Sequence, residues 1–246
     1  MKLLHNLGVF FLFLARVLYK PQHVKLLRQN TVQSLYTLGI ESIPIVFVVS
    51  VFMGGIITIQ TANGFSNPFV PLYAVGFAAR ESIILEFSPT IICLILAGKV
   101  GSNIASEIGT MRITDQIDAL DVLGVNSRQF LILPKITASL LVFPFLVAFS
   151  MVTALCGGYV IGILSESVSG YEFIYGAQAF FKPWVLYYSF TKVVVFAFII
   201  SAVSGYFGYH TKGGALDVGK SSTQSVVYAN VLILLLDLII TKLFFG

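Results

Sequence analysis

Long runs of apolar residues, separated by short polar segments, dominate the chain. A hydrocarbon core of about 30 Å requires roughly 20 apolar residues of helix, because each residue advances the helix by about 1.5 Å. Runs of that size lie at about 41–62, 81–98, 136–163, 184–208 and 224–245. The pattern therefore predicts an all-α membrane protein with five transmembrane helices.

The first 30 residues do not fit this pattern. The apolar stretch at 3–19 is interrupted by His5, Asn6 and Arg16, and no small-residue cleavage site follows it. Basic residues that alternate with Leu, Val and Phe are typical of a helix lying in the headgroup plane. We therefore expect an amphipathic interfacial helix over 1–30 and a five-span domain over 31–246.

Composition excludes a soluble protein. The chain is 57% hydrophobic and 11% charged, whereas soluble domains are about 45–50% apolar and about 25% charged. Cys93 and Cys156 both fall in predicted spans, and no Cys/His cluster indicates a metal. We predict no metal site and no catalytic residue.

The distribution of lysine and arginine predicts the orientation of the chain. Positive residues collect on the cytoplasmic side of membrane proteins. With the N-terminus inside, that side holds most of the 15 basic residues, namely Lys2, Arg16, Lys20, Lys25, Arg28, Lys99, Arg112, Arg128, Lys135, Lys212 and Lys220. The C-terminus is then extracytoplasmic, and these basic loops explain the net charge of +4 without a nucleic-acid partner.

Three ionisable residues, Glu86, Lys192 and Asp237, stand out within the predicted spans. Such residues are costly in a bilayer and require a partner or a water-filled cavity. Lys192 and Asp237 either neutralise each other between packed helices or line a pathway. Glu86 has no basic residue three or four positions away, which favours a position facing a cavity.

Two further features bear on packing and on the cargo. The pair Gly54-Gly55 and the spacing of Gly158 and Gly162 favour close contacts between helices. The connection at about 63–80 is too apolar for an ordinary solvated loop and contains Phe69, Leu72, Tyr73 and Arg80. It requires membrane, a protein partner or an apolar ligand against it.

A polar segment between the second and third predicted spans has helical periodicity. Ile113, Ile117 and Leu120 form one stripe, and a second stripe contains Asp115, Asp118 and Asp121. We expect a helix over about 104–123, with a bend or a close approach at Gly109. One basic and four acidic residues between 104 and 124 give this segment a net negative charge, which anionic lipid would repel. The segment either docks on a cytosolic protein or is simply solvated.

Residues 214–221, GALDVGKS, match the phosphate-binding pattern G-x-x-x-x-G-K-S. That pattern is meaningful only between a buried strand and a helix, and here it lies in a short connection between two spans. We interpret it as a Gly-rich cytoplasmic turn and not as a nucleotide site.

The stretch AGKVGSNIASEIGTMRITDQIDALDVLGV, which begins at Ala97, closely resembles the signature of the MlaE/YrbE family. These proteins are permease subunits of ABC-type lipid transporters that work with MCE-domain proteins. The resemblance continues in LPKITASLLVFPFL, TKVVVFAFIISAVSGYFGY and STQSVVYANVLILLLDLIITKLFF. It covers about 80% of the chain.

The resemblance implies a homodimer in the bacterial inner membrane, with an N-terminal interfacial helix and five spans in each subunit. The helix after the second span is then the coupling helix, which docks in a groove of a cytosolic ABC ATPase. Residues at or near that contact are Glu107, Gly109, Thr110, Met111, Arg112 and Asp118. ATP and Mg²⁺ belong to the ATPase, and no cofactor is expected on this chain.

The resemblance also implies a lipid cavity at the dimer axis, open to the periplasm beneath an MCE ring. Glu86 matches a family acid near that cavity, and Phe69, Leu72 and Tyr73 are candidates for its lining. The family commonly has Arg before this acid, where this chain has Leu85, so Arg80 is a candidate substitute. Lys192 and Asp237 also match family positions and are expected to have a structural or conformational role.

The sequence therefore favours a permease that moves phospholipid between the inner membrane and a periplasmic MCE protein. An ion-coupled secondary transporter of an amphiphile, with Glu86, Lys192 and Asp237 as the relay, is the alternative. A passive membrane scaffold is a third, weaker hypothesis.

Overall fold

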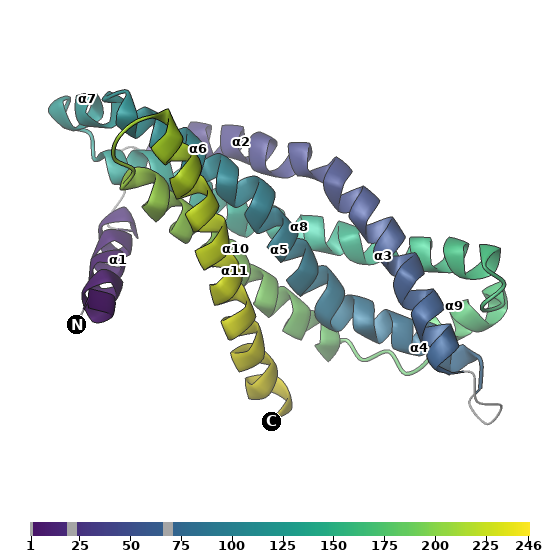
Figure 1. Ribbon diagram of the computed structural model, residues 1–246. Helices are drawn as coiled ribbons and strands as arrows, with labels where there is room; N and C mark the ends of the chain where they lie inside the picture. The colour runs from purple at the N-terminus through teal and green to yellow at the C-terminus, as the bar shows by residue number, and fades with distance from the viewer. Residues whose placement is uncertain (1, 19–23, 66–70) are drawn as a thin grey trace. The chain divides into compact units, whose positions relative to one another are not determined.

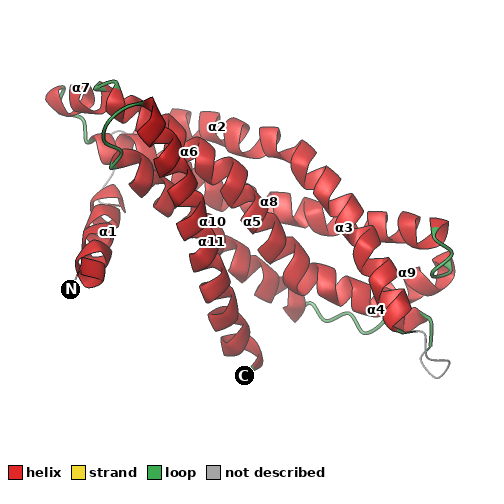
Figure 2. Ribbon diagram, viewed as in Figure 1, coloured by secondary structure: helices red, strands yellow, loops and turns green. Residues whose placement is uncertain are grey.

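The computed structural model describes residues 2–18, 24–65 and 71–246. Over these residues the chain is drawn as helices joined by short loops, without a strand (Figure 2). The α-helices, labelled in Figure 1, are α1 Lys2–Leu18, α2 Val24–Gly39, α3 Ile43–Gly64, α4 Tyr73–Ser82, α5 Ile92–Leu96, α6 Ser102–Ile113, α7 Gln116–Val122, α8 Ser127–Leu164, α9 Gly170–Gln178, α10 Trp184–Tyr209 and α11 Ala215–Phe245.

Among the described residues, five helical runs are long and apolar enough to cross a membrane, which confirms the predicted fold class. They are Lys25–Gly64, Tyr73–Ile113, Ser127–Leu164, Trp184–Tyr209 and Ala215–Phe245. Most of these helical runs extend several residues beyond the apolar runs from which the spans are predicted. At about 1.5 Å per residue, the 38 residues of α8 measure about 57 Å, nearly twice the hydrocarbon thickness of about 30 Å.

The chain forms two compact units, each built from three separate stretches. Unit 1 contains Met1–Ser42, Leu94–Phe143 and Val194–Leu243, and unit 2 contains Ile43–Cys93, Pro144–Val193 and Phe244–Gly246. Both candidate sites described below lie within single units: the segment of α6 and α7 belongs to unit 1, and Glu86 and Lys192 belong to unit 2.

In unit 2, α3 and α8 pack in direct backbone contact, as the glycine spacing predicts. A Cβ on Gly54 would overlap the carbonyl oxygen of Ala154, and one on Gly157 would overlap the carbonyl oxygen of Val51. The approach also brings Ser50 within 2.8 Å of Ser150, to which its hydroxyl donates a hydrogen bond. Small residues here replace the side-chain layer that normally separates two helices.

Gly54→Leu is expected to lower the free energy of unfolding by about 1–3 kcal/mol or more, because backbone atoms of α8 must move to admit the side chain. Gly64→Leu on the same helix is the matched control, since nothing lies within 4 Å of a Cβ there. Denaturant unfolding of both variants in detergent measures the difference. Equal destabilisation by the two substitutions would contradict the close packing of α3 and α8.

Unit 2 also contains a short helix that the hydropathy pattern misses. Helix α9 lies beside α4 (Figure 1), and the backbones touch where a Cβ on Gly76 would overlap the Phe173 carbonyl. Ser169 caps α9 by accepting a hydrogen bond from the Glu172 amide at 3.3 Å, and its hydroxyl donates to the Glu172 carboxylate at 2.8 Å. The pattern Ser-x-x-Glu at 169–172 is a sequence signal for a helix start that could have identified the helix.

The N-terminal helix is shorter than the predicted range of 1–30. Helix α1 ends at Leu18 and α2 begins at Val24, and residues 19–23 lie outside the described residues. Phe13 and Val17 are buried, whereas Phe11 and Leu12 are 66% and 64% exposed. The Phe13 ring packs against Tyr206 and Tyr209 at centroid distances of 5.4 and 5.5 Å. One side of α1 is therefore held by α10, and the exposed apolar side requires lipid.

Candidate functional site

The polar segment after the second predicted span, which we call the connecting segment, consists of α6 and α7. Helix α6 is the last part of the second helical run, Tyr73–Ile113. A single helix over about 104–123 is expected from the sequence, but the helix breaks at Thr114 and Asp115. Asp115 has a φ of 57°, a left-handed conformation that aspartate tolerates better than most residues. The bend therefore falls at Asp115. Gly109 lies inside α6, where a Cβ would come within 3.2 Å of Thr211 and Val218.

Two ion pairs brace the connecting segment. The Lys135 ammonium on α8 lies 2.6 Å from the Glu107 carboxylate, and the Lys135 side chain is only 10% exposed. Arg112 lies 2.5 Å from Asp118, which joins α6 to α7 across the bend. The segment is thus fixed to α8 and to itself, although local sequence pattern gave no sign of either partner.

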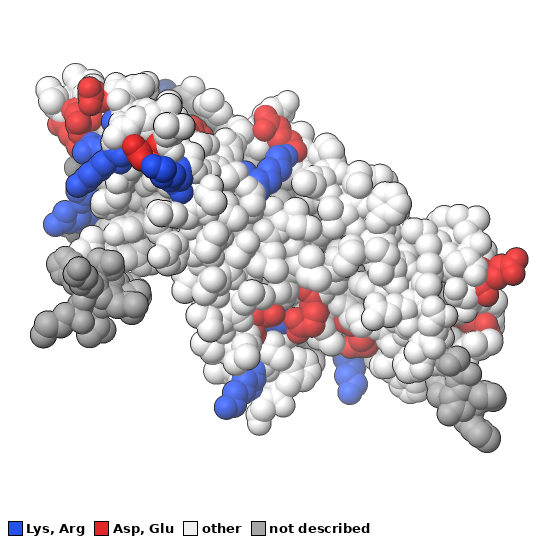
Figure 3. Space-filling model, in the orientation of Figure 1, with Lys and Arg blue, Asp and Glu red and all other residues white. Residues whose placement is uncertain are grey.

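The outer surface of the connecting segment is exposed and mixed in character. Thr110 and Asp118 are exposed, and Met111 is partly exposed. Val122 and Leu123, which the helical stripes do not single out, are 87% and 76% exposed. Acidic and basic side chains gather over α7 and the start of α11 in Figure 3. Charged groups beside exposed apolar groups are typical of a protein-binding surface.

A shallow pocket adjoins the base of this segment. Its volume is about 220 Å³. Glu107 and Met111 of α6 form one side, and residues of α2 and α8 form the rest, namely Asn30, Gln33, Ser34, Thr37, Leu38, Phe130, Leu131, Pro134 and Lys135. The polar lining distinguishes it from a pocket for acyl chains.

The second candidate site is an ion pair in unit 2. Lys192 donates to the Glu86 carboxylate at 2.8 Å, and the Lys192 side chain is fully buried whereas Glu86 is 50% exposed. The Tyr188 hydroxyl donates to the same carboxylate at 3.2 Å. The Lys192 ammonium also lies 4.4 Å from the centre of the Tyr188 ring, where a cation is attracted by the π electrons.

The backbone around Glu86 is unusual. Residues Ile83–Ile91 form a π-helical segment that contains Pro89. Proline has no amide hydrogen and cannot make the regular helical bond, and wide turns of this kind are frequent at functional sites. Glu86 is half exposed, and its position facing a cavity stays a prediction. The structure adds a basic partner that the neighbouring residues do not supply, since Lys192 is 106 residues away.

The other predicted cavity residues occupy different surroundings. Arg80 is buried, and its guanidinium donates to the carbonyl oxygens of Ala177 and Ala179 at 2.9 and 2.8 Å and to Glu81 at 2.5 Å. Arg80 therefore binds the carbonyl groups at the C-terminal end of α9, and a lipid headgroup could reach its guanidinium only if α9 moved.

Leu72 is 52% exposed, and the Tyr73 ring meets Tyr175 edge to face at 5.5 Å. Phe69 lies outside the described residues. Asp237 is partly buried on α11 in unit 1, so its neutralisation of Lys192 stays a prediction.

The phosphate-binding lookalike at 214–221 is largely helical, which corrects its interpretation as a Gly-rich turn. Helix α11 already begins at Ala215, and the amide of Val218 bonds to the Gly214 carbonyl at 3.3 Å. The Lys220 ammonium lies 3.1 Å from the Asp217 carboxylate. A phosphate-binding loop needs a run of free amides before its helix, and here most of the matching residues are in the helix.

These observations define a class of protein. Five long apolar helices, with a buried ammonium and a carboxylate paired among them, are typical of a membrane transport protein. The family model described as "Permease MlaE" matches residues 31–243. The chain belongs to this family, as its resemblance indicated, and is a multi-pass membrane permease.

Relatives from several organisms match the chain along most of its length. A probable ABC transporter permease protein of Rickettsia bellii is 32% identical over 99% of this chain and 94% of its own length. A probable ABC transporter permease protein of Synechocystis is 30% identical over 98% of this chain and 94% of its own length. The protein TRIGALACTOSYLDIACYLGLYCEROL 1, chloroplastic, of Arabidopsis thaliana is 33% identical over 88% of this chain and 62% of its own length.

Proposed function

We propose that this permease is the membrane subunit of an ABC transporter that moves phospholipid between the bacterial inner membrane and a periplasmic MCE protein. Membership of the MlaE permease family and the names of the bacterial relatives support an ABC assembly. The plant relative carries the name of a galactolipid, which supports an amphiphilic cargo. The chain itself performs no covalent chemistry, and ATP and Mg²⁺ are bound by a separate cytosolic ATPase.

The observation that carries the proposal is the braced and exposed connecting segment. A force applied to α6 passes directly to α8 through Glu107 and Lys135, and α8 is a single helix of 38 residues. The ATPase contact comprises Glu107, Thr110, Met111, Arg112 and Asp118, together with Val122 and Leu123. Gly109 contributes indirectly, because its lack of a side chain lets α6 pack against Thr211 and Val218.

The proposed topology places the N-terminus and the connecting segment in the cytoplasm and the C-terminus in the periplasm. Two copies form the lipid cavity at their shared axis, beneath the MCE ring. Helix α11 offers an extensive apolar surface for lipid or a second copy, since only 11% of its most apolar window is buried within the chain. The half-exposed Glu86 and the exposed Leu72 are the candidates for lipid contact.

Transfer of labelled phospholipid from proteoliposomes tests the proposal. The chain is co-expressed with its candidate ATPase and MCE partners and purified through a tag on the chain. We expect the ATPase and the MCE protein to co-purify, and lipid transfer to require ATP. An ATPase variant without its catalytic glutamate is the control and should bind but not drive transfer. Transfer that is independent of the ATPase would contradict the proposal.

The ion-coupled secondary transporter stays the second candidate, and the Glu86–Lys192 pair favours it. A carboxylate beside a buried ammonium can exchange protons when the pair separates. This mechanism predicts transport by the chain alone, lost when an ionophore collapses the proton gradient. The same proteoliposomes without ATPase distinguish the two mechanisms.

A further inference from the structure

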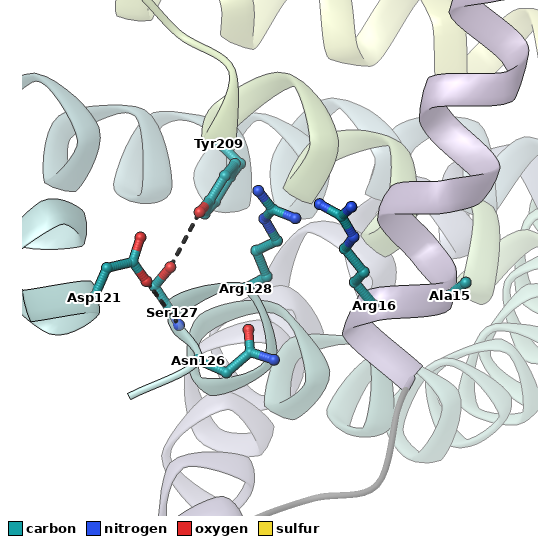
Figure 4. A pocket seen from close by; sticks show the side chains of 7 residues that line it. All are labelled: Ala15, Arg16, Asp121, Asn126, Ser127, Arg128 and Tyr209. Carbon is teal, nitrogen blue, oxygen red and sulfur yellow. Dashed lines mark hydrogen bonds between the residues drawn. The ribbon is translucent and has the colours of Figure 1, made fainter. Parts of the chain in front are cut away.

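A polar pocket in unit 1 lies apart from both candidate sites. Its volume is about 490 Å³, and it is lined by Ala15, Arg16, Asp121, Asn126, Ser127, Arg128 and Tyr209. These residues come from α1, from the last turn of α7, from the loop after it, from the first turn of α8 and from the last residue of α10 (Figure 4). The pocket therefore joins the N-terminal helix to the end of the connecting segment.

Two guanidinium groups dominate this pocket. The side chains of Arg16 and Arg128 turn their charged ends into the same space (Figure 4). Among the described residues, neither group forms an ion pair with a carboxylate. Arg128 instead lies 5.3 Å from the centre of the Tyr209 ring. Two like charges facing one cavity repel each other, and an anion between them would remove that repulsion.

The single acid of the lining does not neutralise the arginines. Asp121 accepts a hydrogen bond from the Ser127 amide at 3.4 Å and lies on the far side of Ser127 from both guanidinium groups in Figure 4. The potential nearby is positive: burial lowers the pKa of His210, and the charges of Arg128 and Arg112 lower it further against the opposing hydrogen bond to Tyr206. The environment is thus suited to an anion.

The pocket also offers neutral hydrogen-bonding groups with fixed positions. The Ser127 and Tyr209 hydroxyls lie 3.0 Å apart and are bonded to each other. Asn126 stands at the N-terminus of α8, where its side-chain oxygen accepts from the Gln129 amide at 3.4 Å. The positive end of the 38-residue helix α8 faces the same region. Two guanidinium groups, hydroxyls and a helix N-terminus together match a phosphate group.

The position of Arg16 indicates where the phosphate comes from. Phe11 and Leu12, about one turn earlier on α1, are 66% and 64% exposed and require hydrocarbon around them. Arg16 lies one turn after Leu12 on the same helix, and a long arginine side chain beside exposed apolar residues can extend its charged end to lipid headgroups. Acyl chains beside Phe11 and Leu12 would place their own phosphate at the mouth of the pocket.

We propose that this pocket binds the phosphate of an anionic membrane phospholipid, which ties α1 to the loop between α7 and α8. The lipid is a bound structural ligand and not the transported cargo. This inference rests on the membrane insertion of the chain and is independent of lipid transport. It makes the position of the connecting segment dependent on the surrounding lipid, because Asp121 is in the last turn of α7 and is bonded to Ser127 at the start of α8.

Native mass spectrometry of the full chain, purified from vesicles of phosphatidylglycerol and phosphatidylcholine, tests the proposal. We expect phosphatidylglycerol to be retained preferentially, and we expect the double variant Arg16→Gln/Arg128→Gln to retain it at least about tenfold less, because both charged hydrogen-bond donors are lost. Arg28→Gln is the matched control, because Arg28 is exposed on α2 and outside the pocket. Equal retention by the double variant and the control would overturn the proposal.

Asp121→Asn provides a second test. Its expected result is a gain of lipid retention, which a misfolded protein would not show. Removal of the only negative charge in the lining is expected to increase phosphatidylglycerol retention two- to tenfold, and unchanged or weaker retention would count against the site. Inorganic phosphate added at millimolar concentration distinguishes the source of the anion. Little displacement of the lipid is expected, whereas full displacement would show a site for free phosphate and overturn the lipid assignment.

Discussion

Lys192→Glu is expected to lower the free energy of unfolding by about 3–5 kcal/mol, the range found when a buried ion pair is broken. The side chain at this position is fully buried, and its ammonium lies 2.8 Å from the Glu86 carboxylate. The substitution places a second carboxylate against the first, and the new carboxylate is fully buried and cannot be hydrated. Denaturant unfolding in detergent, followed by circular dichroism, measures the loss.

The charge-reversed pair identifies the cause of that loss. Glu86→Lys/Lys192→Glu restores opposite charges and should recover at least half of the lost stability. Lys182→Glu makes the same change at an exposed lysine and should alter stability by less than about 0.5 kcal/mol. If Lys192→Glu unfolded at the same denaturant concentration as the unchanged protein, the Glu86–Lys192 contact would not be a stabilising ion pair.

Glu107→Lys is expected to abolish ATP-driven lipid transfer, and a second substitution separates the two roles of Glu107. The single variant sets two ammonium groups together, because Glu107 lies 2.6 Å from the largely buried Lys135. This contact alone is expected to contribute about 1.5–3 kcal/mol of stability. The single variant therefore combines a folding defect with any docking defect.

Glu107→Lys/Lys135→Glu rebuilds the ion pair while keeping the charge reversed at the exposed position. Its stability should return to within about 1 kcal/mol of the unchanged protein, because the pair is restored. ATPase association and lipid transfer should stay at least tenfold reduced, because the ATPase still meets a positive charge at position 107 in place of a negative one. Pull-down of the ATPase and lipid transfer in proteoliposomes provide the two measurements.

Glu166→Lys is the matched control for the charge change, since Glu166 is an exposed residue between α8 and α9. It should leave both ATPase association and lipid transfer unchanged. Full recovery of transfer by the charge-reversed pair at 107 and 135 would show that Glu107 acts only by bracing α6. The coupling contact would then have to be sought among Arg112, Asp118 and the exposed end of α7.

Local pattern is a good guide to the elements of this chain where a bilayer dictates them. A span needs about 20 apolar residues in one run, so the centres of the five spans follow from hydropathy alone. The ends of the helices do not, because helical hydrogen bonds continue into polar residues once a helix has formed. Thus hydropathy predicts the third span at about 136–163, whereas α8 begins at Ser127.

The break in the connecting segment shows a different limit. The apolar stripe of Ile113 and Ile117 is continuous across Asp115, so periodicity predicts one helix. Asp115 nevertheless adopts a left-handed conformation, and Arg112 reaches across the bend to Asp118. Such a turn depends on contacts that form only when both helices are in place.

The sequence by itself determined the class of fold, the five apolar spans, the polar segment between the second and third of them, and the family. Each of these depends on composition or on spacing within one turn or one span. The tertiary structure alone decided which charges meet. Glu86 and Lys192 are 106 residues apart, Glu107 and Lys135 are 28 apart, and Arg16 and Arg128 share a pocket although they stand on different helices. No local period encodes such pairings, because they depend on which faces of the helices come together when the bundle packs.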